Sequence, residues 1–428
     1  MPPEPIEPRL TTIQWVTSQL RFDRLPGAPT DALPSYLSWE EVISAAQSEG
    51  LAGFLLSRLD ARTQAEMPVM AFGSLEYSHI AMLVQNSVYF QELERLLAYL
   101  AANEIPVIVL KGAALTMVLY GRRDIRPMVD LDLLVPEADF ARVIELLQTF
   151  GYAPSTDIFK RIGSEIQLNR VINDGATIDR ALLESSGFVS LEATMDGEDT
   201  SFQPETVAVG ETSIAIDLHW HLVSSTFYTR HVPMDWFWEH TALVEIGQQH
   251  ARVFSPEAQL LHLCSHHALH HADQGLFWLY DIAELIRQYG SILDWDTVIT
   301  LANRYEWGRS LASAVEGVFT VFGMPVDPAV KLKVSRLQES PQERFTRAMV
   351  GRFSWVLVNG WQHVGLRRRL GFWLRMLFPP ADYMRRRYGA SGRIRLGTQY
   401  LRRAIDGVHA LGSDLWLGAA ILIRRERT

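Results

Sequence analysis

The chain has 428 residues, of which 48% are hydrophobic and 21% are charged, with a net charge of −9. This composition excludes a disordered chain and leaves room for two or three domains. A disulfide framework is also excluded because Cys264 is the single cysteine. Its apolar helical surroundings predict a buried thiol rather than a nucleophile.

The distribution of charge is uneven along the chain. From Trp361 onward there are 14 arginines and four acidic residues, so this part carries +10 and the remainder −19. Such a basic segment could bind an anionic membrane surface, a nucleic acid or the acidic body of the same chain, or it could be a solvated face without a partner. The first residues lack the pattern of a secretory signal, and no apolar run is long enough to cross a membrane. We therefore expect a cytoplasmic protein, with peripheral attachment to a membrane left open.

The N-terminal part is predicted to be helical after a loose start. Residues 1–34 are rich in proline and polar residues and are typical of an arm with one short helix. Residues 35–103 are expected to form an all-helical region. Ser38 and Glu41 have the spacing of a capping box, and leucines 93, 96, 97 and 100 follow helical periodicity.

The most informative segment lies between residues 105 and 135. Pro106 to Leu110 reads as a buried strand, Lys111-Gly112 as a tight exit, and the following residues to Tyr120 as a helix. A glycine at that position lets backbone N–H groups face a phosphate. Asp130 and Asp132 then share one face of an apolar strand, where two repelling carboxylates are stabilised by a divalent cation.

The later segments complete the predicted organisation. Residues 137–150 form an amphipathic helix that ends at Gly151, and residues 152–210 are polar and acidic, as expected for an insertion with short strands. An alternating strand over residues 212–222 carries Asp217. Ser255, Pro256 and Glu257 mark a strong helix start. The predicted units are a core at 104–223, a helical domain at 232–325 and a helical, Arg-rich region at 326–428.

Three blocks in this order resemble a bacterial nucleotidyltransferase family of the polymerase-β-like superfamily. They are Leu110-Lys-Gly with Tyr120-Gly, Arg126-Pro-Met-x-Asp-x-Asp-Leu-Leu-Val135, and Asp217-Leu-His-Trp220. The resemblance covers about residues 37–403. It implies an α+β fold in which a small mixed sheet with helices is flanked by N- and C-terminal helical regions. One departure is Lys111-Gly112, since many superfamily members have Gly-Ser or Gly-Gly there.

The resemblance also implies roles for individual residues. Asp130, Asp132 and Asp217 would hold Mg²⁺ or Mn²⁺, and Asp217 would also act as general base on the acceptor. A second group of residues would bind the phosphates of the NTP co-substrate, and we expect at least one arginine to be among those that do. The candidates are Lys111, Gly112, Arg122, Arg123 and Arg126.

Several residues keep two interpretations each. His219 and His221 alternate with Asp217, so either could position the acceptor, or both could be hydrogen-bonded beneath the site. Asp281, in a Trp-Leu-Tyr-Asp element, could contact the acceptor or cap a neighbouring helix. A helix with five histidines could hold a metal, pack, or contact the acceptor: His262, His266, His267, His270 and His271.

The function predicted from these patterns is a Mg²⁺-dependent nucleotidyltransferase that moves an NMP group from an NTP to an acceptor and releases pyrophosphate. The acceptor could be a small molecule, a peptide or protein side chain, or RNA. The alternative is a catalytically inactive nucleotide-binding or scaffold protein that docks on an anionic partner through its basic C-terminal region.

Overall fold

The structure is a computed structural model. It describes residues 11–24, 28–155, 164–172, 177–179, 206–208, 212–350, 381, 384–385 and 397–402. Most of the predicted Arg-rich region and most of segment 180–210 lie outside these ranges. No helix within them is long and apolar enough to cross a membrane.

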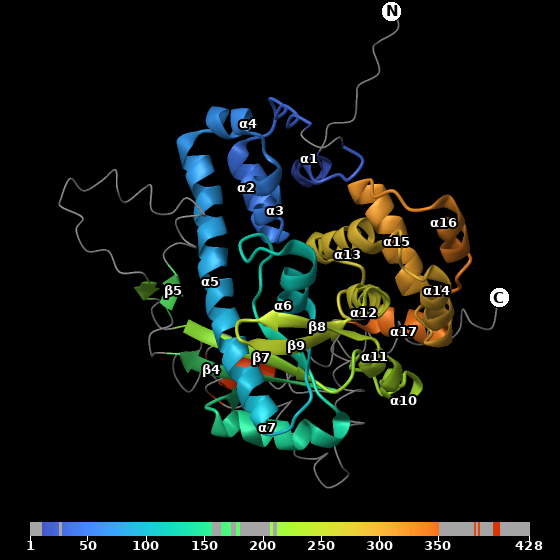
Figure 1. Cartoon of the computed structure of the whole chain (residues 1–428). Helices are drawn as coiled ribbons and strands as arrows, with labels where there is room; N and C mark the ends of the chain where they lie inside the picture. Colours follow the sequence, from blue (N-terminus) through green and yellow to red (C-terminus); the bar gives the residue numbers. More distant parts are fainter. Residues whose placement is uncertain are drawn as a thin grey trace, which may run out of the picture.

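The N-terminal region is helical, as predicted, and it leads into one helix that runs along most of the molecule (Figure 1). Ser38 caps the second helix through a capping box with Glu41, in agreement with the sequence. The long helix ends at Ala102, next to the predicted end. The five helices are α1 (Thr12–Gln19), α2 (Trp39–Ser48), α3 (Ala52–Arg58), α4 (Ala61–Glu66) and α5 (Val69–Ala102).

The core is a mixed seven-stranded sheet with strand order β3-β4-β7-β2-β1-β9-β8. Strand β2 runs parallel to β7 and antiparallel to β1, and β1 runs parallel to β9. The predicted α+β architecture is confirmed. The strands of this sheet are β1 (Ile108–Val109), β2 (Leu131–Leu134), β3 (Ala153–Pro154), β4 (Glu165–Ile172), β7 (Thr212–His219), β8 (Thr241–Ile246) and β9 (Gln249–Phe254). Two further strands, β5 (Thr177–Asp179) and β6 (Thr206–Ala208), pair antiparallel in a separate two-stranded sheet.

Two parts of the sheet come from segments that were expected to lie outside it, one as an insertion with short strands and the other as part of a helical domain. Strand β4 lies within the predicted insertion, yet it pairs with β7 along the whole of both strands. The β8–β9 hairpin lies within the predicted helical domain, and it turns at Gly247 with φ +60°. Both segments contain many polar residues, because one face of each strand faces away from the core. Strands β3 and β4, at the start of the 152–210 segment, are therefore part of the sheet.

Short helices connect and flank these strands. Lys111 begins α6 (Lys111–Leu115), which continues as one π-helical turn, η1 (Thr116–Tyr120), and ends at Gly121 with φ +62°. The predicted helix over residues 113–120 is thus present in two parts. The other connections are a 3₁₀ turn, η2 (Glu137–Asp139), α7 (Phe140–Thr149), α10 (Tyr228–His231) and α11 (Asp235–Glu239).

The C-terminal helices begin at Ser255, whose side chain accepts the backbone N–H of Ala258 with Pro256 in the first turn. This confirms the predicted helix start. The first of these helices packs against the next three. They are α12 (Pro256–Leu269), α13 (Leu276–Tyr289), α14 (Trp295–Arg304), α15 (Gly308–Phe322), α16 (Pro328–Ser335) and α17 (Pro341–Met349).

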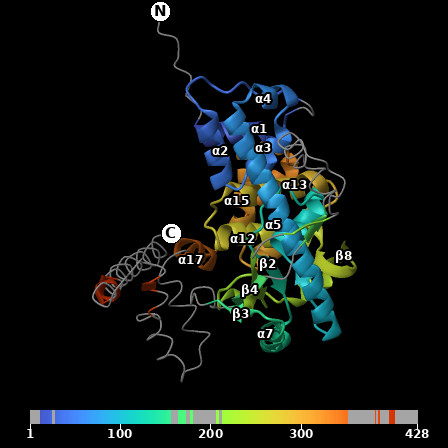
Figure 2. The same ribbon diagram turned by 90° about the vertical axis from the view of Figure 1, so that its left-hand side faces the viewer.

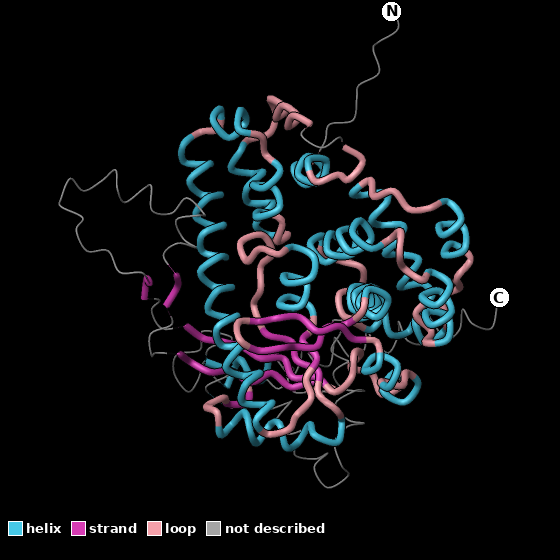
Figure 3. Tube along the Cα trace, in the orientation of Figure 1, coloured by secondary structure: helices cyan, strands magenta, loops and turns pink. Residues whose placement is uncertain are grey.

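The two faces of the sheet pack against different helices. One face contributes Leu133, Ile216 and Leu218 to a core shared with α7 and the C-terminal half of α5. The other contributes Ile108, Leu110 and Leu134 to a core shared with the N-terminal helices and α12 to α15. Figures 2 and 3 show helices on both sides of the strands. Side chains that alternate with Leu133 and Leu218 therefore face the C-terminal helices.

Candidate active site

The register between β2 and β7 brings two predicted carboxylates together. Asp132 is the direct neighbour of Asp217, and Leu134 is the neighbour of His219. The leucines between them point into the core on the opposite face. Asp132 and Asp217, 85 positions apart in the sequence, therefore lie side by side on the face that looks toward the C-terminal helices.

Lys111 lies over this pair of strands. Its Nζ is 2.7 Å from Asp132 Oδ1, and its side chain is 14% exposed. Burial alone would lower the pKa of Lys111, but the Asp132 carboxylate outweighs it and raises the pKa. The residue has φ +43°, a strained conformation for a lysine, which is the kind of outlier that clusters at functional sites.

The glycine after this lysine has a packing role. A Cβ at Gly112 would lie 2.9 Å from Met128 Cγ and 3.0 Å from an Arg126 nitrogen. Glycine therefore lets the first turn of α6 approach the loop that leads into β2.

Two further polar side chains join the carboxylates. His219 Nε2 is 3.0 Å from Asp132 Oδ1, and His219 Nδ1 is 3.4 Å from a Glu165 oxygen. Gln167 donates a 2.8 Å hydrogen bond to Asp217 Oδ1. Glu165 and Gln167 belong to β4, in the segment that was expected to be an insertion with short strands, but the role of these two residues was not identified from the sequence. The signal that could have revealed it is their alternation with buried Ile166 and Leu168.

Burial and mutual repulsion perturb the pKa values of the three carboxylates. Burial, together with Asp132 and Asp217, raises the pKa of Asp130 to about 7. Burial and the charge of Asp132 also raise the pKa of Asp217. Burial acts in the same direction on Asp132, but Lys111 and His219 outweigh it and hold the pKa of that carboxyl well below its usual range.

This donor set fits a divalent cation chemically. Among the described residues no hydrogen bond or ion pair reaches the Asp130 carboxylate, and hard cations prefer such oxygen ligands. Within those residues, however, no group of three or more His, Cys, Asp or Glu side chains already has the arrangement of a metal site. At Asp132 the nearest positive charge is the Lys111 ammonium. A bound cation would share that carboxylate with it.

Arg126 and Asp281 contact each other rather than lying free in the site. The Arg126 guanidinium donates three hydrogen bonds of 2.8–3.0 Å to Asp281, and Tyr120 donates another of 2.7 Å. The side chains of Arg126 and Asp281 are 4% and 0% exposed. Each side chain is thus the buried partner of the other, and phosphate binding by Arg126 and acceptor contact by Asp281 remain predictions from the sequence.

The two other arginines of the loop are also engaged. Arg122 pairs with Asp124 at 2.6 Å, and the Arg123 guanidinium lies 4.5 Å from the centre of the Phe90 ring. The side chain of Arg122 is 54% exposed. Phosphate binding by Arg122 and Arg123 remains a prediction from the sequence.

Helix α5 holds the loop that leads to Asp130. Asn86, fully buried, donates to the carbonyl oxygen of Arg126 at 2.8 Å. Gln85 donates to the carbonyl oxygen of Met128, and Tyr89 donates to that of Val129, at 2.8 and 2.7 Å. Side chains from one helix therefore hold three consecutive parts of the loop. These residues were not identified from the sequence, because their partners lie about 40 positions away.

His221 differs from His219 in its hydrogen-bond partners. Its Nε2 lies 3.0 Å from the carbonyl oxygen of Val232, and its Nδ1 accepts the backbone N–H of Val223 at 3.2 Å. Burial lowers its pKa to about 4. Both ring nitrogens are used by the backbone, so of the two histidines only His219 contacts a carboxylate of the site.

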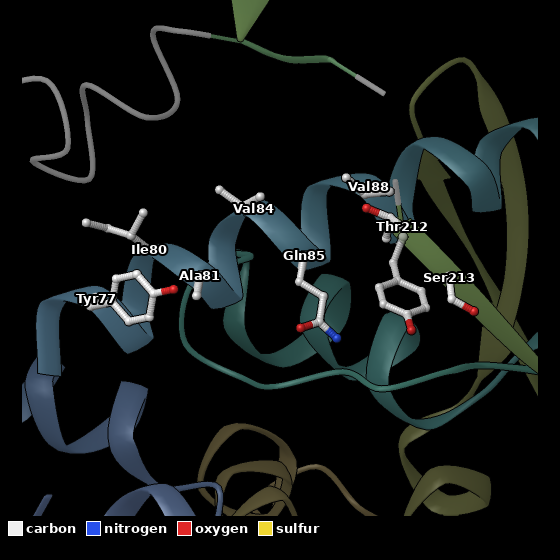
Figure 4. Close-up of a pocket in the computed structure, with 9 residues that line it drawn as sticks. Tyr77, Ile80, Ala81, Val84, Gln85, Val88, Thr212 and Ser213 are labelled. Atoms are coloured by element: carbon white, nitrogen blue, oxygen red, sulfur yellow. The ribbon is translucent and has the colours of Figure 1, made fainter. Parts of the chain in front are cut away.

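A cavity of about 450 Å³ lies beside α5 and the start of β7 (Figure 4). Its lining is largely apolar but includes Gln85, Tyr89 and Ser213. The Tyr89 hydroxyl donates to the carbonyl oxygen of Val129, the residue before Asp130, and burial and the charge of Asp130 raise its pKa. The cavity therefore adjoins the edge of the site at Asp130.

A family model described as an uncharacterised nucleotidyltransferase matches residues 35–323. A crystal structure of an antigenic nucleotidyltransferase-like protein from Paracoccidioides brasiliensis is similar at 15% identity and a TM-score of 0.30, over 57% of this chain and 97% of that one. No curated protein matches. Because the family model spans more than half of the chain, the chain belongs to this nucleotidyltransferase family.

Proposed function

We propose that the protein is a Mg²⁺-dependent nucleotidyltransferase that transfers an NMP group from an NTP to an acceptor and releases pyrophosphate. The observation that carries the proposal is the placement of Asp132 beside Asp217 on adjacent parallel strands, with Asp130 at the entrance to β2. Membership of a nucleotidyltransferase family supports the same reaction class.

The carboxylates of Asp130, Asp132 and Asp217 would hold the metal, for which Mn²⁺ is an alternative. When bound, the cation supplies positive charge to the attacking and leaving oxygens of the displacement. Lys111 would donate to an NTP phosphate, exchanging part of its contact with Asp132 for a second anion. Its compact ammonium group suits such a contact.

In the proposed reaction an acceptor oxygen forms a bond to the α-phosphorus of the NTP. The bond from that phosphorus to the bridging oxygen breaks, and the leaving group is pyrophosphate. The acceptor proton passes to Asp217, the carboxylate on β7 that lies beside Asp132. His219, fixed between Asp132 and Glu165, keeps the Asp132 carboxylate in place.

The cavity beside α5 is our proposed position for the nucleobase. Its volume of about 450 Å³ is within the usual range for ligand pockets, roughly 300–1,000 Å³. An apolar wall with a carboxamide and a phenol is also typical of such pockets. A base there would leave the triphosphate near Asp130.

One observation favours the alternative of a nucleotide-binding or scaffold protein without turnover. Lys111 already neutralises Asp132, which is the carboxylate that a metal must share. An anionic partner of the Arg-rich end remains a prediction, because most of that end lies outside the described residues.

The test is label transfer from ATP in the presence of Mg²⁺. The full-length protein is incubated with a lysate fraction and with α-labelled or γ-labelled ATP. Nucleotidyl transfer retains the α label on an acceptor and never the γ label. Asp132→Asn should abolish retention, whereas Asp296→Asn, a surface aspartate on α14 with a 76% exposed side chain, should not. Retention of the γ label alone would replace the proposal with phosphoryl transfer.

A further inference from the structure

Helix α12 and its C-cap residue, His270, carry a row of polar side chains along one face. Gln259, His262, His266 and His270 follow one another at intervals of three, four and four residues, which is the spacing of a single helical face. Gln259 and His262 are 1% exposed and His266 is 5% exposed. The row is thus buried along most of its length, and His270 at its end is partly exposed.

Most polar atoms of this row lack a partner among the described residues. They are both side-chain heteroatoms of Gln259, both ring nitrogens of His262, Nδ1 of His266 and Nε2 of His270. Buried polar groups in native proteins are almost always hydrogen-bonded, because leaving them unpaired is destabilising. So many open positions on one helix face indicate that something else supplies the hydrogen bonds.

The histidines of the row lie within electrostatic reach of the site. Burial is the main cause that lowers the pKa of His262, His266 and His270, and the positive charge of Lys111 is the next cause for all three. Asp132 acts on His262 and His270 in the opposite direction. Lys111 binds Asp132, and α12 packs in the core that also contains Leu110 and Leu134, on the face of the sheet that carries this carboxylate.

Ring contacts make the row continuous. The ring centres of His262 and His266 are 5.9 Å apart, and those of His266 and His270 are 4.8 Å apart. At the partly exposed end, His271 stacks on Trp278 with centres 3.5 Å apart, and its Nε2 lies 3.0 Å from that of His266. The row therefore extends from the interior of α12 to an aromatic pair near the surface.

The open positions have a particular chemistry. A neutral imidazole offers one donor and one acceptor, and a carboxamide offers both kinds. Hydroxyl groups match such a set, because each of them both donates and accepts. An anion would match only the donors and a cation only the acceptors. Within the described residues these histidines form no metal group, and the contact between the His266 and His271 nitrogens is a hydrogen bond in which one ring is the donor.

We propose that the α12 row binds the acceptor of the transfer reaction and that this acceptor is a small uncharged molecule with several hydroxyl groups. The role as acceptor rests on the proposed nucleotidyltransferase function. Binding of a polyol by the row does not, and can be measured without turnover.

The first experiment measures binding directly. Full-length protein labelled with ¹⁵N at histidine is titrated with myo-inositol, glucose, inorganic phosphate, a serine-containing peptide and ATP in separate samples. Resonances of the row are assigned by their loss in His262→Leu and His266→Leu. We expect shifts with myo-inositol or glucose. Shifts caused only by phosphate, only by the peptide or only by ATP, or no shift at all, would overturn the proposal.

The second experiment separates a binding site from a structural network of water. His262→Leu removes open ring nitrogens, whereas His221→Leu removes two formed hydrogen bonds from an equally buried histidine. We expect the melting temperature of His262→Leu to stay within about 1 °C of the parent or rise, and that of His221→Leu to fall by about 2 °C or more. A matching fall in His262→Leu would assign the row to the fold and contradict the proposal.

Activity then connects the row to transfer. His262→Leu should bind MgATP as the parent does and lose at least tenfold in label transfer. If the parent neither binds MgATP nor transfers label, the proposed function fails, and polyol-induced shifts would still establish the binding site. If the variant transfers label at the parent's rate, the row is not the acceptor site.

Discussion

The ion pair between Arg126 and Asp281 joins the loop before Asp130 to α13, and Asp281→Asn tests what it does. Both side chains are almost completely buried, and three hydrogen bonds link them. Replacing the carboxylate leaves a buried guanidinium without a counter-charge, for which the expected loss is about 3–5 kcal/mol of unfolding free energy. Urea denaturation monitored by tryptophan fluorescence measures this value.

A second variant separates structure from phosphate binding. Arg126→Met combined with Asp281→Leu removes both charges and should recover most of that stability, because buried pairs can often be replaced by apolar side chains. Its affinity for MgATP should stay within about threefold of the parent if the pair only positions the loop. Arg62→Ala is the control, since its exposed pair with Glu66 contributes little to stability. A loss of more than tenfold in MgATP affinity with stability retained would refute the positioning role and make Arg126 a phosphate ligand.

Four further predictions follow from the site. Asp217→Asn should keep most of the NTP affinity and lose turnover, and full activity in calorimetric binding and label-transfer assays would remove Asp217 from the site. Lys111→Ala should weaken MgATP binding more than it slows transfer; unchanged affinity would show that the lysine serves only Asp132. Val84→Trp should fill the α5 cavity and weaken nucleotide binding without changing metal binding in calorimetry, and equal nucleotide affinity would place the base elsewhere. Burial lowers the pKa of His221 from 6.5 to about 4, so the unfolded state binds more protons between these values. The stability is therefore complete above about pH 6.5 and falls by up to about 3 kcal/mol as the pH falls to about 4. Urea denaturation at pH 7 and 5 should show a smaller loss for His221→Gln, and an equal loss would contradict this assignment.

The parts of the fold and of the site that were predictable from the sequence depend on local patterns. Ser38 and Ser255 have capping residues at fixed short spacings, and both cap their helices as expected. The pairing of Asp132 with Asp217 followed from a resemblance to a family, and the strand register brings them together. Alternation along a strand then determines the face on which each carboxylate lies.

The parts that were not predictable depend on partners far away in the chain. Arg126, a predicted phosphate ligand, contacts Asp281, 155 positions later, and this ion pair was not predicted. Nothing in the local sequence of either residue specifies the other. The same holds for Gln167, which reaches Asp217 only because β4 pairs with β7. Side-chain partners of this kind are chosen by packing of whole elements, which local periodicity does not encode.

The segments that were assigned differently show a second limit. Strands β4 and β8–β9 have polar residues on their outward faces, so composition alone suggested an insertion and a helical domain. Gly247 between two alternating runs was the available signal for the second of these. Periodicity was a better guide than composition at these positions.

The central claim, that the carboxylates on β2 and β7 support nucleotidyl transfer, is tested most directly by the stoichiometry of one turnover. Enzyme, MgATP labelled at the α-phosphate and an acceptor-containing fraction are mixed, and pyrophosphate release is measured alongside incorporation of the label. The account predicts one pyrophosphate released for each labelled NMP transferred, and neither product with Asp130→Asn or Asp132→Asn. Release of inorganic phosphate without incorporation, or equal transfer by the two variants, would contradict it.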